Sequence, residues 1–163
     1  MASLFKNIKQ AGFTLIEVLL YISFFVLIVG ALLGVAYQTI GATQQINKKI
    51  LVQQESDFVL RKIDWALSGA SAVSTGPKPS DMAVTRFFAP NSIVFSQNGN
   101  FIDINSGTGT VDLNSQNVLV SNVVFTETQV SPNPPEIQTN FTLSAASDPS
   151  SGQNFELTKF LRQ

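Results

Sequence analysis

One acidic side chain near the start of the sequence stands next to a long apolar run. Glu17 is followed by residues 18–37, which include no charged residue. A carboxylate in such a setting is costly to desolvate, so it usually has a functional role and a positively charged or hydrogen-bonding partner. The chemistry indicated here is therefore charge pairing in an apolar environment, with Glu17 as the negative partner.

Residue types that carry enzymatic chemistry are scarce. The chain has no cysteine and no histidine, which removes the thiolate nucleophile, the commonest general base and the commonest metal ligand. Residues 103–107 (DINSG) have alternating oxygen ligands but lack the distal glutamate of a calcium loop. We therefore expect a hairpin turn there, no bound metal, no cofactor and no enzymatic activity.

The charge balance gives no indication of nucleic-acid binding. The 163 residues include 10 basic and 11 acidic side chains. A nucleic-acid-binding protein typically presents a strongly basic surface to the phosphates, so we predict no nucleic-acid partner.

The run at residues 18–37 has the length of a membrane-spanning helix, because about 20 apolar residues cross a hydrocarbon layer of roughly 30 Å. Lys6 and Lys9 precede it, and the next basic residue is Lys48. This asymmetry predicts a single span in the cytoplasmic membrane with a cytoplasmic N-terminus and an exported C-terminal part. An ordinary secretory signal would need its small-residue cleavage site after the apolar run.

Residues 11–17 (AGFTLIE) resemble the prepilin processing motif of type IV pilins and type II secretion pseudopilins. The small residue, the phenylalanine and the glutamate all match, directly ahead of an uncharged run. The resemblance covers residues 1–70 well and rests on coarse architecture beyond them. The pattern of the helix and the C-terminal residues 155–162 are weakly similar to minor pilins or to the J-type pseudopilins.

The resemblance implies a role for three residues. Residues 1–12 would be a leader that a prepilin peptidase removes by cleaving between Gly12 and Phe13, and the new amine of Phe13 would be methylated. Glu17 would set the assembly register by pairing with the Phe13 amine of a neighbouring subunit. The implied partners are the prepilin peptidase, other pilin or pseudopilin subunits, a membrane assembly platform and the lipid bilayer.

Two glycines in the apolar run are spaced as G-x-x-x-G. Small residues at this spacing, Gly30 and Gly34, let two helices approach closely in lipid. Each glycine also lowers helix propensity by about 1 kcal/mol relative to alanine. Helix packing, local flexibility and simple tolerance of glycine all remain open for this pair.

The helix is predicted to continue past the membrane segment (residues 13–37) as an amphipathic half over residues 38–70, ending near Gly69. No proline interrupts it, and its apolar residues recur at helical spacing. Members of the expected buried face are Leu51, Phe58 and Trp65 at seven-residue steps, and Val52, Val59, Ile63, Ala66 and Ala70 beside them. We expect this face to lie on a sheet.

Prolines and Gly76 predict a linker at residues 71–91. Short β-type runs then follow from residue 92 to the end, and the Asn98-Gly99 pair predicts a tight turn between two of them. Sequential strands with short turns favour antiparallel pairing. The predicted fold class is α+β, with a long N-terminal helix packed on a small antiparallel head at residues 92–163, as in pilins.

Two functions from different classes fit these observations. The first is a pilin-like structural subunit, such as a minor pilin or pseudopilin, that leaves the membrane to join a cell-surface pilus or a secretion pseudopilus. The second is a membrane-anchored exported binding module that never polymerises. Processing after Gly12 and incorporation into filaments distinguish the two.

Overall fold

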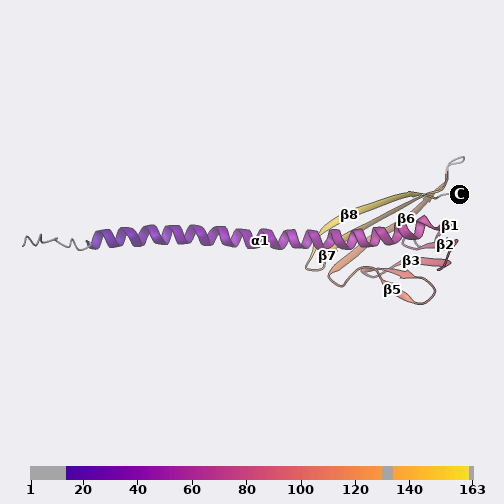
Figure 1. Ribbon diagram of the computed structural model, residues 1–163, viewed down its shortest axis with the longest axis horizontal. Helices are drawn as coiled ribbons and strands as arrows, with labels where there is room; N and C mark the ends of the chain where they lie inside the picture. The colour runs from indigo at the N-terminus through magenta and orange to yellow at the C-terminus, as the bar shows by residue number, and fades with distance from the viewer. Residues whose placement is uncertain (1–13, 130–133, 162–163) are drawn as a thin grey trace, which may run out of the picture. The chain divides into compact units, whose positions relative to one another are not determined.

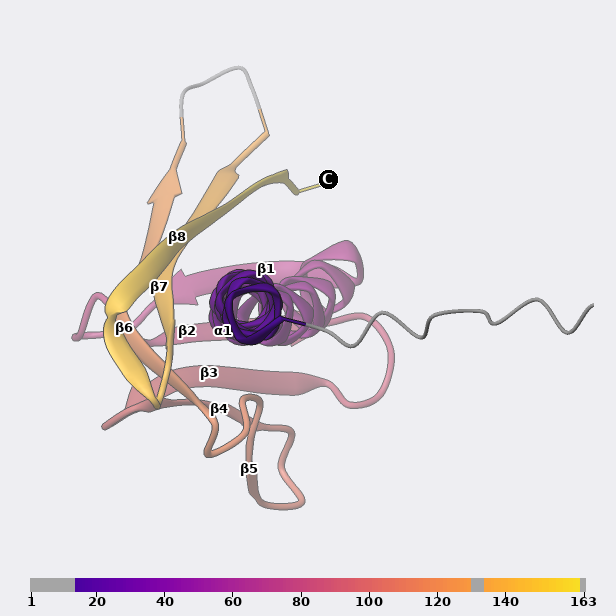
Figure 2. The same cartoon turned by 90° about the vertical axis from the view of Figure 1, so that its left-hand side faces the viewer.

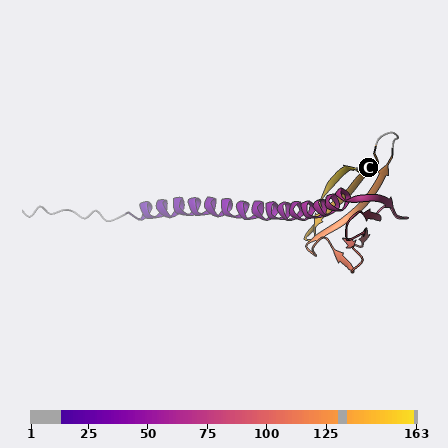
Figure 3. The same cartoon turned by 45° about the vertical axis from the view of Figure 1, so that its right-hand side comes forward.

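The computed structural model describes residues 14–129 and 134–161 (Figure 1). The chain divides into two units, Met1–Gln45 and Ile46–Gln163. We call them the apolar unit and the head unit and describe each by itself. The described part of the apolar unit is helical from residue 15 onward, as Figure 3 shows for the indigo end of the ribbon.

One helix, α1 (Leu15–Ser68), provides residues to both units. Its 54 residues include no proline, so no backbone donor is missing from the helical ladder. The helix ends one residue before Gly69, where the sequence predicted it.

The head unit combines the C-terminal part of α1 with two antiparallel sheets, which Figure 2 shows as separate groups of strands. The five-stranded sheet follows sequence order: β1 (Ala70–Thr75), β2 (Met82–Arg86), β3 (Ser92–Asn98), β4 (Phe101–Asn105) and β5 (Thr110–Asp112). The three-stranded sheet consists of β6 (Val118–Thr128), β7 (Glu136–Ala145) and β8 (Asp148–Phe160). The predicted α+β fold class is confirmed.

The structure differs from the prediction at residues 71–91, where β1 and β2 occupy 10 of the 21 residues of the predicted linker. The two strands pair with each other, and β2 also pairs with β3. The prolines Pro77 and Pro79 fall in the connection between the strands, where a missing backbone donor costs no ladder bond. The proline spacing therefore marked a turn between two strands.

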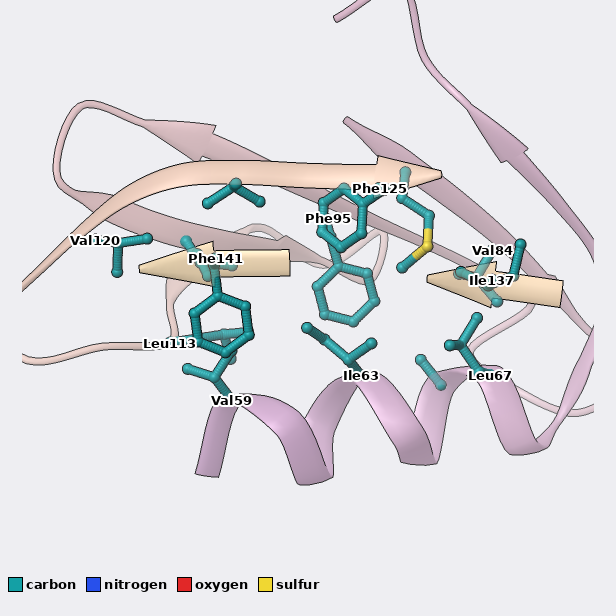
Figure 4. Packing of buried hydrophobic residues seen from close by; sticks show 14 of the residues in the cluster. Val59, Ile63, Leu67, Val84, Phe95, Leu113, Val120, Phe125, Ile137 and Phe141 are labelled. Carbon is teal, nitrogen blue, oxygen red and sulfur yellow. The ribbon is translucent and has the colours of Figure 1, made fainter. Parts of the chain in front are cut away.

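The core of the head unit lies between α1 and the two sheets. Val59, Ile63 and Leu67 of α1 point toward aromatic and aliphatic side chains of the strands, including Phe95 and Phe141 (Figure 4). All five side chains are at most 3% exposed, so this contact supplies much of the hydrophobic stabilisation of the head unit.

The predicted buried face of α1 is only partly buried. Val52, Val59, Ile63 and Ala66 are buried, whereas Phe58 and Trp65 are each 44% exposed. The Lys62 ammonium lies over both exposed rings, 5.5 Å and 5.9 Å from their centroids. The larger aromatic side chains thus lie at the border of the buried face, where cations cover them.

The side-chain amides of Asn114 and Gln97 form hydrogen bonds that link the two sheets. The Asn114 Oδ1 accepts a hydrogen bond from the Ile102 amide at 2.9 Å, and its Nδ2 donates to the Val118 carbonyl at 2.7 Å. The Gln97 Oε1 accepts from the Val123 amide at 3.3 Å. These bonds satisfy backbone groups where the chain passes from one sheet to the other.

Candidate functional site

The N-terminus of α1 is capped by Thr14. Its carbonyl accepts hydrogen bonds from the amides of Glu17 at 3.0 Å and Val18 at 3.2 Å, and its Oγ1 lies 3.4 Å from the Glu17 amide. Threonine is a favoured cap because its hydroxyl satisfies an amide that the first helical turn leaves unpaired. The cap fixes the helix start immediately ahead of Glu17.

Glu17 lies in the first turn of α1, where the partial positive charge of the helix end favours a carboxylate. The Tyr21 hydroxyl donates a hydrogen bond to the Glu17 Oε1 at 3.2 Å, one turn further along. Glu17 is half-buried, although its neighbours on either side, Ile16 and Val18, are exposed. The carboxylate is therefore held against the helix by a hydroxyl.

The side chains after Glu17 form an apolar surface that the described part of the chain leaves exposed. Large residues along this stretch are exposed, from Leu19 at 53% to Phe25 at 67% and Val35 at 62%. In the described part of the chain, α1 is the one helix long and apolar enough to cross a membrane. Such an N-terminal helix indicates a membrane anchor or a signal segment.

Hydroxyl side chains within this helix donate hydrogen bonds to backbone carbonyls of the same helix. Ser23 donates to the Leu19 carbonyl at 2.8 Å and Thr39 to the Val35 carbonyl at 2.9 Å. Each bond runs back one turn, so the polar atom needs no water. This arrangement suits a helix whose surroundings are apolar.

The structure places only some of the predicted site residues. Gly12 and Phe13 lie outside the described residues, so cleavage and methylation stay predictions. A Cβ on Gly30 or on Gly34 would meet no atom within 4 Å. The space beside both glycines is open within this chain, and their role in helix packing stays a prediction.

Tyr21 is the site residue that the sequence reasoning missed. Its position four residues after Glu17 placed both side chains on one helix face, which was a readable signal. An aromatic ring within an apolar run is also typical of simple packing, so the spacing alone does not predict a bond. The hydrogen bond between the two side chains shows that the tyrosine also has a polar role.

The head unit carries two features of its own. A groove of about 630 Å³ is lined by the end of α1, by Phe87 and Phe88, and by the end of β8, including Phe160. These three phenylalanines are 58–78% exposed. Separately, Asp103 and Asp112 lie opposite each other on β4 and β5.

The Asp103 carboxyl is buried, and its Oδ1 has no hydrogen-bond partner among the described residues. Burial is the main cause that raises the pKa of Asp103, followed by the facing Asp112 carboxyl, and the Asn98 side chain opposes the rise. Within residues 14–129 and 134–161, no three acidic side chains gather to hold a metal ion. The predicted absence of a metal stays a prediction.

Comparison of the chain with protein-family models, curated proteins and solved structures found no match. A long N-terminal helix begins with an exposed apolar stretch, and its C-terminal part packs on antiparallel sheets. This arrangement is pilin-like.

Proposed function

We propose that this protein is a non-enzymatic structural subunit of the pilin type, most similar in role to a minor pilin or a pseudopilin. A prepilin peptidase cleaves it between Gly12 and Phe13 and methylates Phe13. A membrane assembly platform then adds the subunit to a type IV pilus or a type II secretion pseudopilus at the cytoplasmic membrane. The observation that carries this proposal is the capped helix start, with Glu17 in its first turn and an exposed apolar surface behind it.

An exposed apolar helix of this length needs lipid or other helices around it, because water would order unfavourably along its surface. In the membrane, lipid tails cover it. In a filament, the same helices of neighbouring subunits cover it. The Phe13 ammonium of a neighbour would then neutralise Glu17 where water is excluded.

Immunogold labelling of sheared cell-surface filaments tests this proposal. The label is expected on filaments from cells with intact assembly genes and on none from cells in which those genes are deleted. Since a pseudopilus is short, the same antibody is also applied to pseudopili lengthened by overproduction of their major subunit. Label confined to the membrane in every case would contradict assembly.

The role of Glu17 is tested by Glu17→Val, co-expressed with the unaltered chain. The variant is expected to be cleaved and inserted normally, yet to be recovered in sheared filaments several-fold less than the unaltered chain. Thr39→Val is a matched control, because it also removes a polar group from α1 and its hydroxyl bonds within the helix. Equal recovery of the Glu17 variant and the control would rule out the register role.

A second candidate function rests on the exposed groove of the head unit. Phe87, Phe88 and Phe160 form a partly apolar surface that a membrane-anchored binding module could use. Under this alternative the protein stays in the membrane as a single subunit. Immunogold label on filaments would support the structural subunit and contradict the binding module that stays in the membrane.

A further inference from the structure

We propose that Tyr21 is a positioning residue for Glu17, holding one carboxylate oxygen so that the other faces the ammonium of an incoming subunit. This inference rests on the proposed assembly function and adds a residue that the processing motif does not include. The observation behind it is the hydrogen bond from the Tyr21 hydroxyl to the Glu17 Oε1 at 3.2 Å.

Helix geometry makes this contact specific. Side chains on an α-helix lean toward its N-terminus, so the side chain at position 21 reaches back over position 17. Two other hydroxyls lie nearby, but Thr14 Oγ1 contacts the Glu17 backbone amide at 3.4 Å, and Ser23 donates to the Leu19 carbonyl at 2.8 Å. Among these three, Tyr21 is therefore the hydroxyl that donates to the Glu17 carboxylate.

The Glu17 carboxylate can accept a second partner while Tyr21 stays bound. An ionised carboxylate has two oxygens and about four acceptor positions. Tyr21 occupies one position on Oε1, so Oε2 keeps its full capacity to accept an ammonium. The hydroxyl can thus stay in place when the subunits pair.

The bond also restricts the side-chain rotation of Glu17. Glu17 is half-buried between exposed neighbours, which agrees with a side chain held against the helix. A free glutamate samples several rotamers, and ordering it at the moment of pairing costs conformational entropy. Because Tyr21 already orders the carboxylate, less entropy is lost when the neighbour arrives.

Tyr21→Phe tests the inference, because it removes one oxygen and keeps the ring. Tyr37→Phe is the matched control, since it makes the same change at another exposed position of the apolar unit. Each variant is co-expressed with the unaltered chain, and its share in sheared filaments is divided by its share in the membrane. We expect a share about three- to tenfold lower for Tyr21→Phe and an unchanged share for Tyr37→Phe.

The double variant Glu17→Val/Tyr21→Phe shows whether Tyr21 acts through Glu17. Removing the hydroxyl is expected to cause no further loss once the carboxylate is absent. A further loss in the double variant, or an unchanged share for Tyr21→Phe, would overturn the inference alone. Failure of the unaltered chain to enter filaments would overturn the proposed function and this inference together.

Discussion

At the scale of single residues, the buried Asp103 carboxyl makes the stability of the head unit depend on pH. Burial and the facing Asp112 raise its pKa in the folded chain above the ordinary value of 3.8. In the unfolded chain the group therefore loses its proton at a lower pH than in the folded chain. As pH rises from below 3.8 through the raised folded pKa, the head unit loses stability, and the loss is complete above that pKa.

Asp103→Asn is expected to remove this loss. The variant should unfold at a higher temperature than the unaltered chain at pH 7, and the difference should disappear near pH 3, where both side chains are uncharged. Thermal unfolding of the detergent-solubilised chain, followed by circular dichroism, measures it. Asp57→Asn, at an exposed position on α1, serves as the control. An Asp103→Asn variant less stable than the unaltered chain at pH 7 would contradict a raised pKa of Asp103 in the folded chain.

The contact between Arg86 and Trp65 depends on the absence of a side chain at Gly69. The guanidinium Cζ lies 4.1 Å from the centroid of the Trp65 ring. A Cβ on Gly69 would lie 2.7 Å from the Arg86 Nη2 and 2.9 Å from its Nε. Alanine at this position would therefore displace the guanidinium from the ring.

Gly69→Ala is expected to shift the fluorescence emission of Trp65, the one tryptophan in the chain. The loss in unfolding free energy should be about 1 kcal/mol, the usual size of a cation–π contact at a partly exposed site. Gly41→Ala is the matched control, because a Cβ there would meet no atom within 4 Å. An emission spectrum that both alanine variants share with the unaltered chain would disprove the contact.

At the scale of the elements, α1 separates buried from exposed positions within one helix. Ile63 is fully buried against the sheets, whereas Ile50 is 49% exposed. Ile63→Ala is expected to lower the unfolding free energy by about 2–5 kcal/mol, because it removes buried methyl groups and leaves a cavity. Ile50→Ala should cost less than about 1 kcal/mol. Denaturant titration of both variants measures the difference in unfolding free energy. Equal losses for the two variants would contradict the burial of Ile63 in the core.

The strands show what local sequence could and could not predict. The predicted tight turn at Asn98-Gly99 joins β3 to β4, whereas residues 103–105, which were expected in a hairpin turn, belong to β4. The glycine of the preceding turn has a φ of 60°, as the Asn98-Gly99 pair indicated. A turn that is specified by its own residues, such as Asn98-Gly99, could therefore be predicted from the sequence.

Hydrogen bonding between residues distant in sequence determined the strand bounds that the local sequence did not predict. β8 runs from Asp148 to Phe160 because it pairs along the length of β7, from Glu136 with Phe160 to Ala145 with Asp148. An ion pair of 3.8 Å between Asp148 and Lys48 of α1 also holds this end of the strand. The division into two sheets likewise depends on the amides of Gln97 and Asn114, whose partners are far apart in sequence.

At the scale of the whole molecule, the two units differ in the environment that they require. The described residues of the apolar unit expose large hydrophobic side chains, whereas the head unit has a core of buried aliphatic and aromatic residues. A chain with both needs an apolar phase for one part and tolerates water around the other. A subunit that moves from a membrane to a filament core meets this requirement in both places.

The candidate site could be predicted in part. The charge pattern singled out Glu17, since a carboxylate next to an uncharged run is rare enough to be informative. The spacing of four residues places Tyr21 on the same helix face as Glu17, but it does not distinguish a hydrogen bond from simple packing of the ring, and the structure shows the bond. Cleavage between Gly12 and Phe13 and methylation of Phe13 stay predictions, because both residues lie outside the described part of the chain.

The intact mass of the membrane-extracted protein tests the central claim, processing as a prepilin, most directly. After co-expression with an active prepilin peptidase, the mass is expected to correspond to a chain that begins at Phe13, has lost residues 1–12 and carries one added methyl group. Gly12→Val is expected to keep the full leader, because the resemblance to prepilins implies that a small residue is needed at the cleavage site. A mature chain that begins after Tyr37, or an unaltered chain that keeps its leader beside the active peptidase, would contradict the claim.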